Sequence, residues 1–146
     1  VSAGMEVLMT TSRRTPPDVG NALKQMATHP AFCLAVFVDE QQYNPLPGML
    51  AWTNSVVVTE DSFSMISEAV SSGRSTGVLI SGKRENDKIR RSLKLMSDRG
   101  MIFPIRSVAD ANKFIGWRLL RHPKEELDRL MENLILCIGT EADGGA

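Results

Sequence analysis

Short apolar runs, separated by longer segments with helical spacing, restrict most how this sequence can fold. Each run has the length of a β-strand, and the runs are Glu6–Thr10, Ala31–Val38, Ser55–Thr59, Thr76–Ser81 and Met101–Ile105. Strands that alternate with helices form right-handed βαβ units, in which the strands are parallel. The run at 31–38 is apolar throughout, which is typical of a strand covered on both faces. The pattern predicts an α/β, Rossmann-like fold with a mostly parallel five-stranded sheet and helices on both faces.

Several intervening segments start and stop at residues that favour helix ends. Thr15 stands where an N-cap is expected, because two prolines and Asp18 follow it, and this predicts a helix that runs towards Met26. A second helix is expected over residues 84–99, with Gly100 as its stop. Its buried stripe consists of Ile89, Leu93 and Met96.

The C-terminal part is also expected to be helical. Pro123 begins a helical spacing that continues through Leu127, Leu130, Met131, Leu134, Ile135 and Ile138. At 146 residues the chain has the size of one domain with one core. We therefore expect a single domain with a core over residues 5–106 and a helical segment over 107–146. Because the sequence opens almost at once on a strand-like run without an initiator Met, we expect a fragment of a longer two-domain protein.

Composition and charge exclude several classes of function. Seventeen Lys and Arg residues balance seventeen Asp and Glu residues, so nothing indicates nucleic acid or an anionic membrane as a partner. No apolar run is long enough to cross a bilayer and no signal peptide is recognisable, which predicts a soluble, cytoplasmic protein. The two histidines, His29 and His122, lack neighbours at ligand spacing, so no metal site is predicted.

Some residues with reactive or aromatic side chains are expected to be structural. Cys33 and Cys137 lie in apolar periodic segments and are predicted to be buried and unpaired. Trp52 and Trp117 are predicted to lie in the core or at its rim. The basic residues within 83–99 alternate with acids around an apolar stripe, which is typical of a solvated helix face.

The stretch from Thr59 to Ser75 carries the strongest indication of binding chemistry. It leaves a buried strand, and either Asp61 or Ser62 is a good N-cap for the helix that follows. The N–H groups at a helix N-terminus can hold a phosphate without a basic side chain. Glu68 shares the polar face with Ser64 and lies roughly 9 Å along the helix, where it could accept hydrogen bonds from a ribose. The alternative is a capped amphipathic helix with a solvated Glu.

Other candidate residues follow the neighbouring strands. Arg13 and Arg14 follow the first strand, and their guanidinium groups match phosphate oxygens, although a solvated basic turn is the alternative. Asn44 and Pro45 follow the second strand, where such folds meet the base. Because the carboxyl ends of parallel strands meet at one edge, we expect one crevice. The predicted binding residues are Ser12, Arg13, Arg14, Asn44, Glu60, Asp61, Ser62, Ser64, Met65 and Glu68.

Four motifs resemble those of a known family. They are TSRRTP, NPLPGMLA, VVTEDSFSMISEA with Gly73 after it, and RRSLKLMSDRG. The sequence is similar, from about Met5 to Leu134, to the C-terminal half of the family named after the plant elongated-mitochondria fission factor. Bacterial members are labelled nucleoside-diphosphate-sugar epimerases, and the family in turn resembles GT-B glycosyltransferases. Ser67, Glu68 and Gly73 are similar to the donor motif of the peptidoglycan N-acetylglucosaminyltransferase, which implies that Glu68 binds ribose.

The resemblance implies a donor-binding domain whose ligand is a nucleoside diphosphate sugar. In GT-B enzymes the catalytic base commonly comes from the N-terminal domain, so the resemblance implies a missing N-terminal domain as partner. On this view the chain holds the nucleotide sugar for glycosyl transfer or epimerisation, and its catalytic residues stay unassigned. The alternative is a non-catalytic interaction protein, because the plant member promotes mitochondrial fission through a dynamin-related partner. The sequence predicts no oligomeric state.

Overall fold

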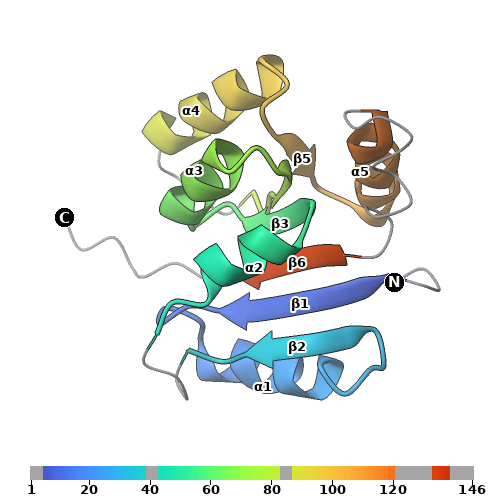
Figure 1. Ribbon diagram of the computed structural model, residues 1–146. Coiled ribbons are helices and arrows are strands. Elements are labelled where there is room, and N and C mark those ends of the chain that lie inside the picture. The colour runs from blue at the N-terminus through green and yellow to red at the C-terminus, as the bar shows by residue number, and fades with distance from the viewer. Residues whose placement is uncertain (1–4, 39–42, 83–86, 121–132, 139–146) are drawn as a thin grey trace.

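A six-stranded sheet organises the described part of the chain, with a helix between successive strands (Figure 1). The computed structural model describes residues 5–38, 43–82, 87–120 and 133–138. The strands are β1 (Glu6–Thr11), β2 (Phe32–Val36), β3 (Ser55–Thr59), β4 (Ser75–Leu79), β5 (Phe103–Ile105) and β6 (Asn133–Ile138). The helices are α1 (Pro17–Met26), α2 (Leu46–Trp52), α3 (Phe63–Ser71), α4 (Asp87–Asp98) and α5 (Val108–Leu120).

The strands follow the order β2-β1-β6-β3-β4-β5, and each neighbouring pair is parallel. The predicted α/β class and Rossmann-like architecture are therefore confirmed. The predicted number of five strands was wrong, because β6 lies between β1 and β3. The helix predicted from Pro123 was wrong over residues 133–138, and residues 123–132 lie outside the described part. A short apolar run in the middle of a sheet satisfies a helical pattern as well as a strand pattern, so spacing could not decide.

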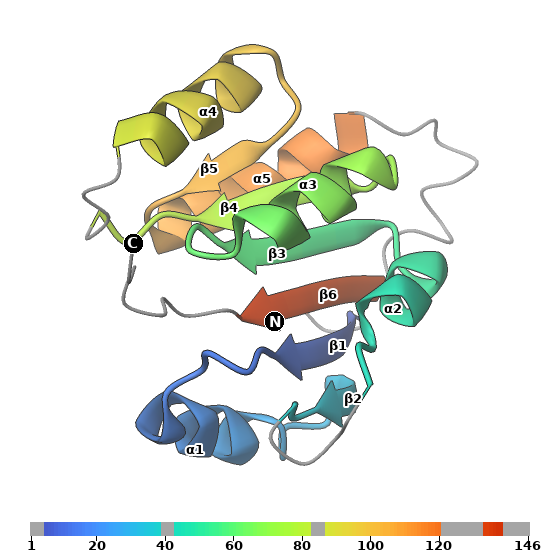
Figure 2. The same cartoon turned by 90° about the vertical axis from the view of Figure 1, so that its left-hand side faces the viewer.

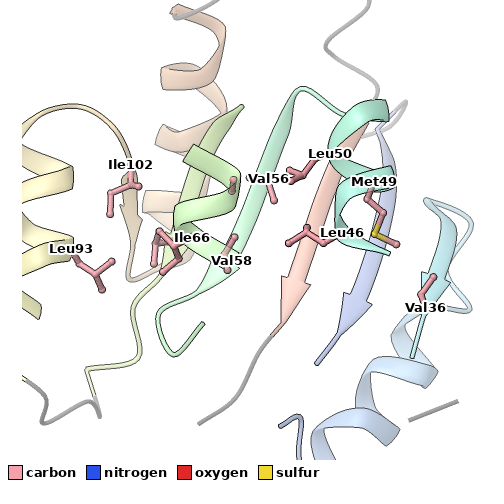
Figure 3. Packing of buried hydrophobic residues seen from close by; sticks show 11 residues of the cluster. Val36, Leu46, Met49, Leu50, Val56, Val58, Ile66, Leu93 and Ile102 are labelled. Carbon is pink, nitrogen blue, oxygen red and sulfur yellow. The ribbon is translucent and has the colours of Figure 1, made fainter. Parts of the chain in front are cut away.

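Helices cover both faces of the sheet. Right-handed crossovers place α2, α3 and α4 on one face, because the steps from β2 to β5 run in one direction, and α1 and α5 on the other. Figure 2 shows α3 in front of the sheet and α5 behind it. The core under α2, α3 and α4 (Figure 3) consists of Val36, Leu46, Met49, Leu50, Val56, Val58, Ile66, Ala69, Val78, Leu93 and Ile102.

A smaller cluster under α5 depends on a glycine in β4. Phe114 packs there against Phe103 and Trp117, with ring centroids 5.9 Å apart in both pairs. A Cβ atom on Gly77 would lie 2.8 Å from Cδ1 of Ile105 and 3.2 Å from the Phe114 ring. The missing side chain therefore lets α5 approach the sheet closely. Trp117 lies at the rim of this cluster, as predicted.

The strand β2 lies at an edge of the sheet, and its surroundings differ from the prediction. The side chains of Cys33 and Leu34 are exposed, so this apolar run is not covered on both faces. Cys33 is a free thiol, as predicted, but it is not buried. The side chain of Cys137 lies outside the described part. Trp52 is 77% exposed, so its predicted place in the core or at the rim was wrong.

The helix α4 has the predicted stripe and the predicted stop. Ile89, Leu93 and Met96 pack into the main core, and Gly100 has a φ of 67°, a left-handed conformation that suits glycine after a helix. The structure describes this helix from Asp87, so residues 84–86 of the prediction lie outside the described part.

Candidate functional site

A polar cavity of about 750 Å³ lies at the carboxyl edge of the sheet and is the candidate site. We call it the switch-point cavity. The connection after β1 runs to one face of the sheet and the connection after β3 to the other, and open α/β sheets bind ligands where the connections diverge in this way. Its lining residues are Thr11, Ser12, Arg13, Arg14, Val38, Tyr43, Asn44, Ser62, Ser64, Met65 and Glu68.

The turn after β1 presents two arginines to the cavity. The backbone N–H of Ser12 donates to Oγ1 of Thr15 at 3.0 Å, and the backbone N–H of Arg14 donates to Oγ of Ser12 at 3.1 Å. These bonds hold the backbone that carries Arg13 and Arg14, whose side chains are exposed. Within the described residues, the Arg13 guanidinium has no hydrogen-bond or ion-pair partner.

The start of α1 differs from the prediction by one residue. Pro16 is the N-cap, and no side chain caps this helix. Thr15, which was predicted to be the N-cap, instead accepts the hydrogen bond from Ser12. The prediction was wrong because the Thr15 hydroxyl accepts a hydrogen bond within the turn before the helix and does not cap the helix itself.

The turns after β2 are tied to β1 and to α2. Oγ1 of Thr11 accepts a hydrogen bond from the backbone N–H of Val38 at 3.1 Å, which joins the ends of the two strands. Oδ1 of Asn44 accepts from the backbone N–H of Leu46 at 3.1 Å, at the start of α2. The oxygen of the Asn44 side chain is therefore used within the fold, and its NH₂ group is the part that can donate to a ligand.

The N-terminus of α3 opens into the cavity. Ser62 is the N-cap, in agreement with the prediction that Asp61 or Ser62 takes this place, but its side chain makes no capping hydrogen bond. The first N–H groups of a helix need partners, so this end of α3 can accept an anion. Glu68 also lines the cavity; it is partly buried, and its carboxylate has no partner within the described residues.

A glycine with a left-handed conformation follows the C-terminal end of α3. Gly73 has a φ of 76°, and its backbone N–H donates to the carbonyl of Val70 at 3.0 Å. Glycine adopts this left-handed conformation without a steric penalty, so Gly73 ends the helix. It lies outside the lining of the switch-point cavity.

Glu60 and Asp61 are the two predicted binding residues that do not line the cavity. Glu60 is only 6% exposed, and its carboxylate accepts hydrogen bonds from the backbone N–H of Ser81, at 2.7 Å, and from the Ser81 hydroxyl. It therefore ties the end of β3 to the end of β4, and buried carboxylates require such partners. Asp61 is partly buried on the connection between Glu60 and Ser62.

Tyr43 is a lining residue that the sequence analysis missed. Its side chain is 60% exposed and borders both the switch-point cavity and a second depression of about 530 Å³, which we call the apolar groove. The groove is lined by Glu6, Leu8, Leu34, Val36, Tyr43, Asn44, Pro45, Gly48, Met49 and Trp52. An aromatic residue directly before a predicted site residue was the available signal, because exposed aromatic rings often serve recognition.

Metal ligands and membrane spans are not found in the described part of the chain. No three His, Cys, Asp or Glu side chains there gather in a way that could hold a metal ion. The helices that the structure describes are all too short or too polar to cross a bilayer.

The strand order and the cavity define a Rossmann-like α/β domain with a ligand-sized polar cavity at the switch point of its sheet. The family described as "Mitochondrial fission ELM1" matches residues 1–128, and the chain belongs to this family. This confirms the family resemblance of the sequence motifs.

One relative is the Mitochondrial fission protein ELM1 of Arabidopsis thaliana. It is 30% identical to this chain over 130 residues. The match covers 88% of this chain but 29% of that protein, so the chain spans less than a third of the relative's length. No solved structure matches the chain.

Proposed function

We propose that the switch-point cavity binds a nucleoside diphosphate as part of a nucleotide sugar, as the donor-binding domain of a GT-B glycosyltransferase does. One observation carries the proposal. Arg13 and Arg14, after β1, line the same cavity as Ser62, Ser64 and Glu68, after β3. Two guanidinium groups and an uncapped helix N-terminus match the anionic part of a nucleotide sugar. The carboxylate in the same cavity matches its hydroxyl groups.

The diphosphate lies between the first turn of α3 and the turn after β1. The helix end supplies backbone N–H donors and a partial positive charge, since no side chain caps it. Arg13, without a partner in the described chain, supplies a guanidinium fork that can hold two phosphate oxygens. The helix N-terminus and the Arg13 guanidinium therefore both favour the same ligand group, one with several negatively charged oxygens.

The sugar and the base lie further along the cavity. Glu68 stands one to two turns beyond the N-cap, and its carboxylate accepts hydrogen bonds from the ribose hydroxyls. Tyr43 and Asn44 provide an aromatic face and an NH₂ donor for the base. Met65 supplies an apolar contact from α3.

Glycosyl transfer or epimerisation then requires residues from outside this chain. Glu68 is the one carboxylate among the described lining residues, and in this proposal it is occupied by the ribose. An acid and a base for the reaction would come from an N-terminal domain that closes over the cavity. The chain by itself therefore binds the donor and positions it.

A thermal-shift screen of nucleoside diphosphates, their sugar conjugates and inorganic phosphate tests the proposal. A ligand that binds the folded state raises the melting temperature, and the rise grows with ligand concentration. We expect a rise with a nucleoside diphosphate and a loss of that rise in Arg13→Gln/Arg14→Gln. Arg99→Gln, an exposed arginine outside the cavity, is the matched control. The proposal fails if no nucleotide raises the melting temperature of the wild type.

A second candidate function is protein interaction in mitochondrial fission, with a dynamin-related protein as partner. The family description mentions fission, and the apolar groove presents Leu34, Tyr43 and Trp52 as exposed apolar side chains. Exposed apolar patches of this kind are common at interaction sites. Co-precipitation with a dynamin-related GTPase distinguishes the candidates: Trp52→Ala should weaken it and Glu68→Gln should not. The same loss in both variants would speak against the groove as the contact surface.

A further inference from the structure

A third depression, of about 950 Å³, lies between α4 and the carboxyl ends of β4 and β5. We call it the α4 cavity. It shares no lining residue with the switch-point cavity. Its lining residues are Glu60, Ile80, Ser81, Gly82, Asp87, Arg90, Arg91, Leu93, Lys94, Ser97, Asp98, Ile102, Pro104 and Arg106. The basic residues of this segment therefore border a cavity, whereas the sequence predicted a simple solvated face.

The fold fixes the direction from which the basic side chains approach. Leu93 is buried in the main core and anchors α4, and Arg90, Arg91 and Lys94 of the same helix line the cavity beside it. Arg106 also lines the cavity and comes from another element, because it directly follows β5. Its backbone N–H donates to Oδ2 of Asp110 at 3.0 Å, and this bond holds the start of α5 against the end of the strand.

Two of the three acidic side chains around the cavity already have hydrogen-bond or ion-pair partners. The third lies at a helix N-terminus, which favours its negative charge. Glu60 accepts two hydrogen bonds from Ser81, and Asp98 forms an ion pair with Lys94 at 2.7 Å. Asp87 lies in the first turn of α4, where the helix dipole favours a negative charge. The negative charges of this wall therefore have local compensation.

The three arginines lack such compensation. Arg90, Arg91 and Arg106 line the cavity, and in the described part of the chain none of their guanidinium groups has a hydrogen-bond or ion-pair partner. Like charges that converge on one cavity repel each other, so an anion between them is favoured. Each guanidinium can hold two oxygens of one phosphate group.

We propose that the α4 cavity binds a molecule that carries two or more phosphate groups. The cavity is large enough for a small organic polyphosphate, and three guanidinium groups, from α4 and from the end of β5, match several phosphate groups better than a single carboxylate. The same chemistry is available in a soluble polyphosphate and in a phosphorylated lipid headgroup. This site is additional to the nucleotide site and does not depend on it.

Calorimetry with inorganic tripolyphosphate tests the site in an Arg13→Gln/Arg14→Gln background, which removes the guanidinium contacts of the switch-point cavity. We expect binding in that background and a loss of about tenfold or more in affinity when Arg90→Gln and Arg91→Gln are added. Arg99→Gln is the matched control, because Arg99 follows the same helix but does not line the cavity. Circular dichroism should show an unchanged fold, since these arginines are exposed.

Vesicles distinguish the two sources of phosphate. Co-sedimentation with phosphatidylcholine vesicles that contain phosphatidylinositol bisphosphate, compared with phosphatidylcholine alone, indicates a lipid headgroup if the arginine pair is required. Tripolyphosphate binding without vesicle binding indicates a soluble ligand. The proposal is overturned if neither probe binds, or if Arg99→Gln weakens binding as much as the arginine pair does. Nucleoside diphosphate binding to Arg90→Gln/Arg91→Gln reports on the switch-point cavity, and tripolyphosphate binding to Arg13→Gln/Arg14→Gln reports on the α4 cavity, so failure of one site is distinguishable from failure of the other.

Discussion

Glu68 and Glu60 show how two similar residues come to have different roles. Both carboxylates belong to the connection and helix after β3, and both were candidates for the ligand site. Glu68 faces the switch-point cavity without a partner in the described chain, whereas Glu60 is buried and accepts two hydrogen bonds from Ser81. The first arrangement leaves a carboxylate for a ligand, and the second uses it to hold two strand ends together.

Glu68→Gln is expected to weaken nucleoside diphosphate binding by about one to two decades, because a charge-assisted contact to ribose is worth about 1.5–3 kcal/mol. The melting temperature without ligand should change little, since the side chain has no partner in the described chain. Calorimetry on wild type, Glu68→Gln and the neighbouring control Ser67→Ala measures the effect. Equal affinities in all three proteins would mean that Glu68 is a solvated helix residue.

Glu60→Ala is expected to destabilise the fold by about 1–3 kcal/mol, because the backbone N–H and hydroxyl of Ser81 lose the acceptor that ties β4 to β3. Urea unfolding, followed by circular dichroism, measures this change. Ligand affinity at the switch-point cavity should be unchanged in the variant that remains folded. If the variant has wild-type stability but no longer binds the nucleotide, Glu60 contacts the ligand and its role is not structural.

At the scale of elements, the packing of α5 on the sheet depends on Gly77. Gly77→Ala is expected to cost about 1–3 kcal/mol of stability, because its Cβ would press on Ile105 and the Phe114 ring. Gly20→Ala is the matched control: Gly20 lies in α1 with open space around it, and alanine there should stabilise by about 0.5–1 kcal/mol. Urea unfolding should give changes in the free energy of unfolding of opposite sign for the two variants. Equal changes would contradict a close approach of α5 at Gly77.

The elements also show what the sequence could predict. The β3 strand and its helix were predicted closely, since a continuous apolar run and a run of capping residues are both local signals. Arg13, Asn44 and Ser64 were placed together because the carboxyl ends of parallel strands share an edge. The role of Glu60 could not be predicted, because it depends on Ser81 in another connection. The β6 strand was missed because its conformation depends on the strands on either side.

At the scale of the whole molecule, β6 joins two groups of strands. It pairs with β1 over Glu6–Thr11 and with β3 over Ser55–Val58. Removal of residues 133–146 is therefore expected to abolish cooperative unfolding, because two internal strand edges lose their partner at once. Thermal melts followed by circular dichroism, and the fluorescence of a dye that binds apolar surface, measure this change. A truncated protein that melts as sharply as the wild type would show that β1 and β3 do not need β6.

The central place of β6 in the sheet has a consequence for the order in which the chain can fold. During synthesis the ribosome releases β1 to β5 first, so local units such as β1-α1-β2 and β3-α3-β4 can form early. The contacts of β6 with β1 join residues that are far apart in sequence, and such long-range pairing is slow. The switch-point cavity lies between the ends of β1 and β3, which β6 holds in place, so the binding site becomes complete only after β6 has been inserted.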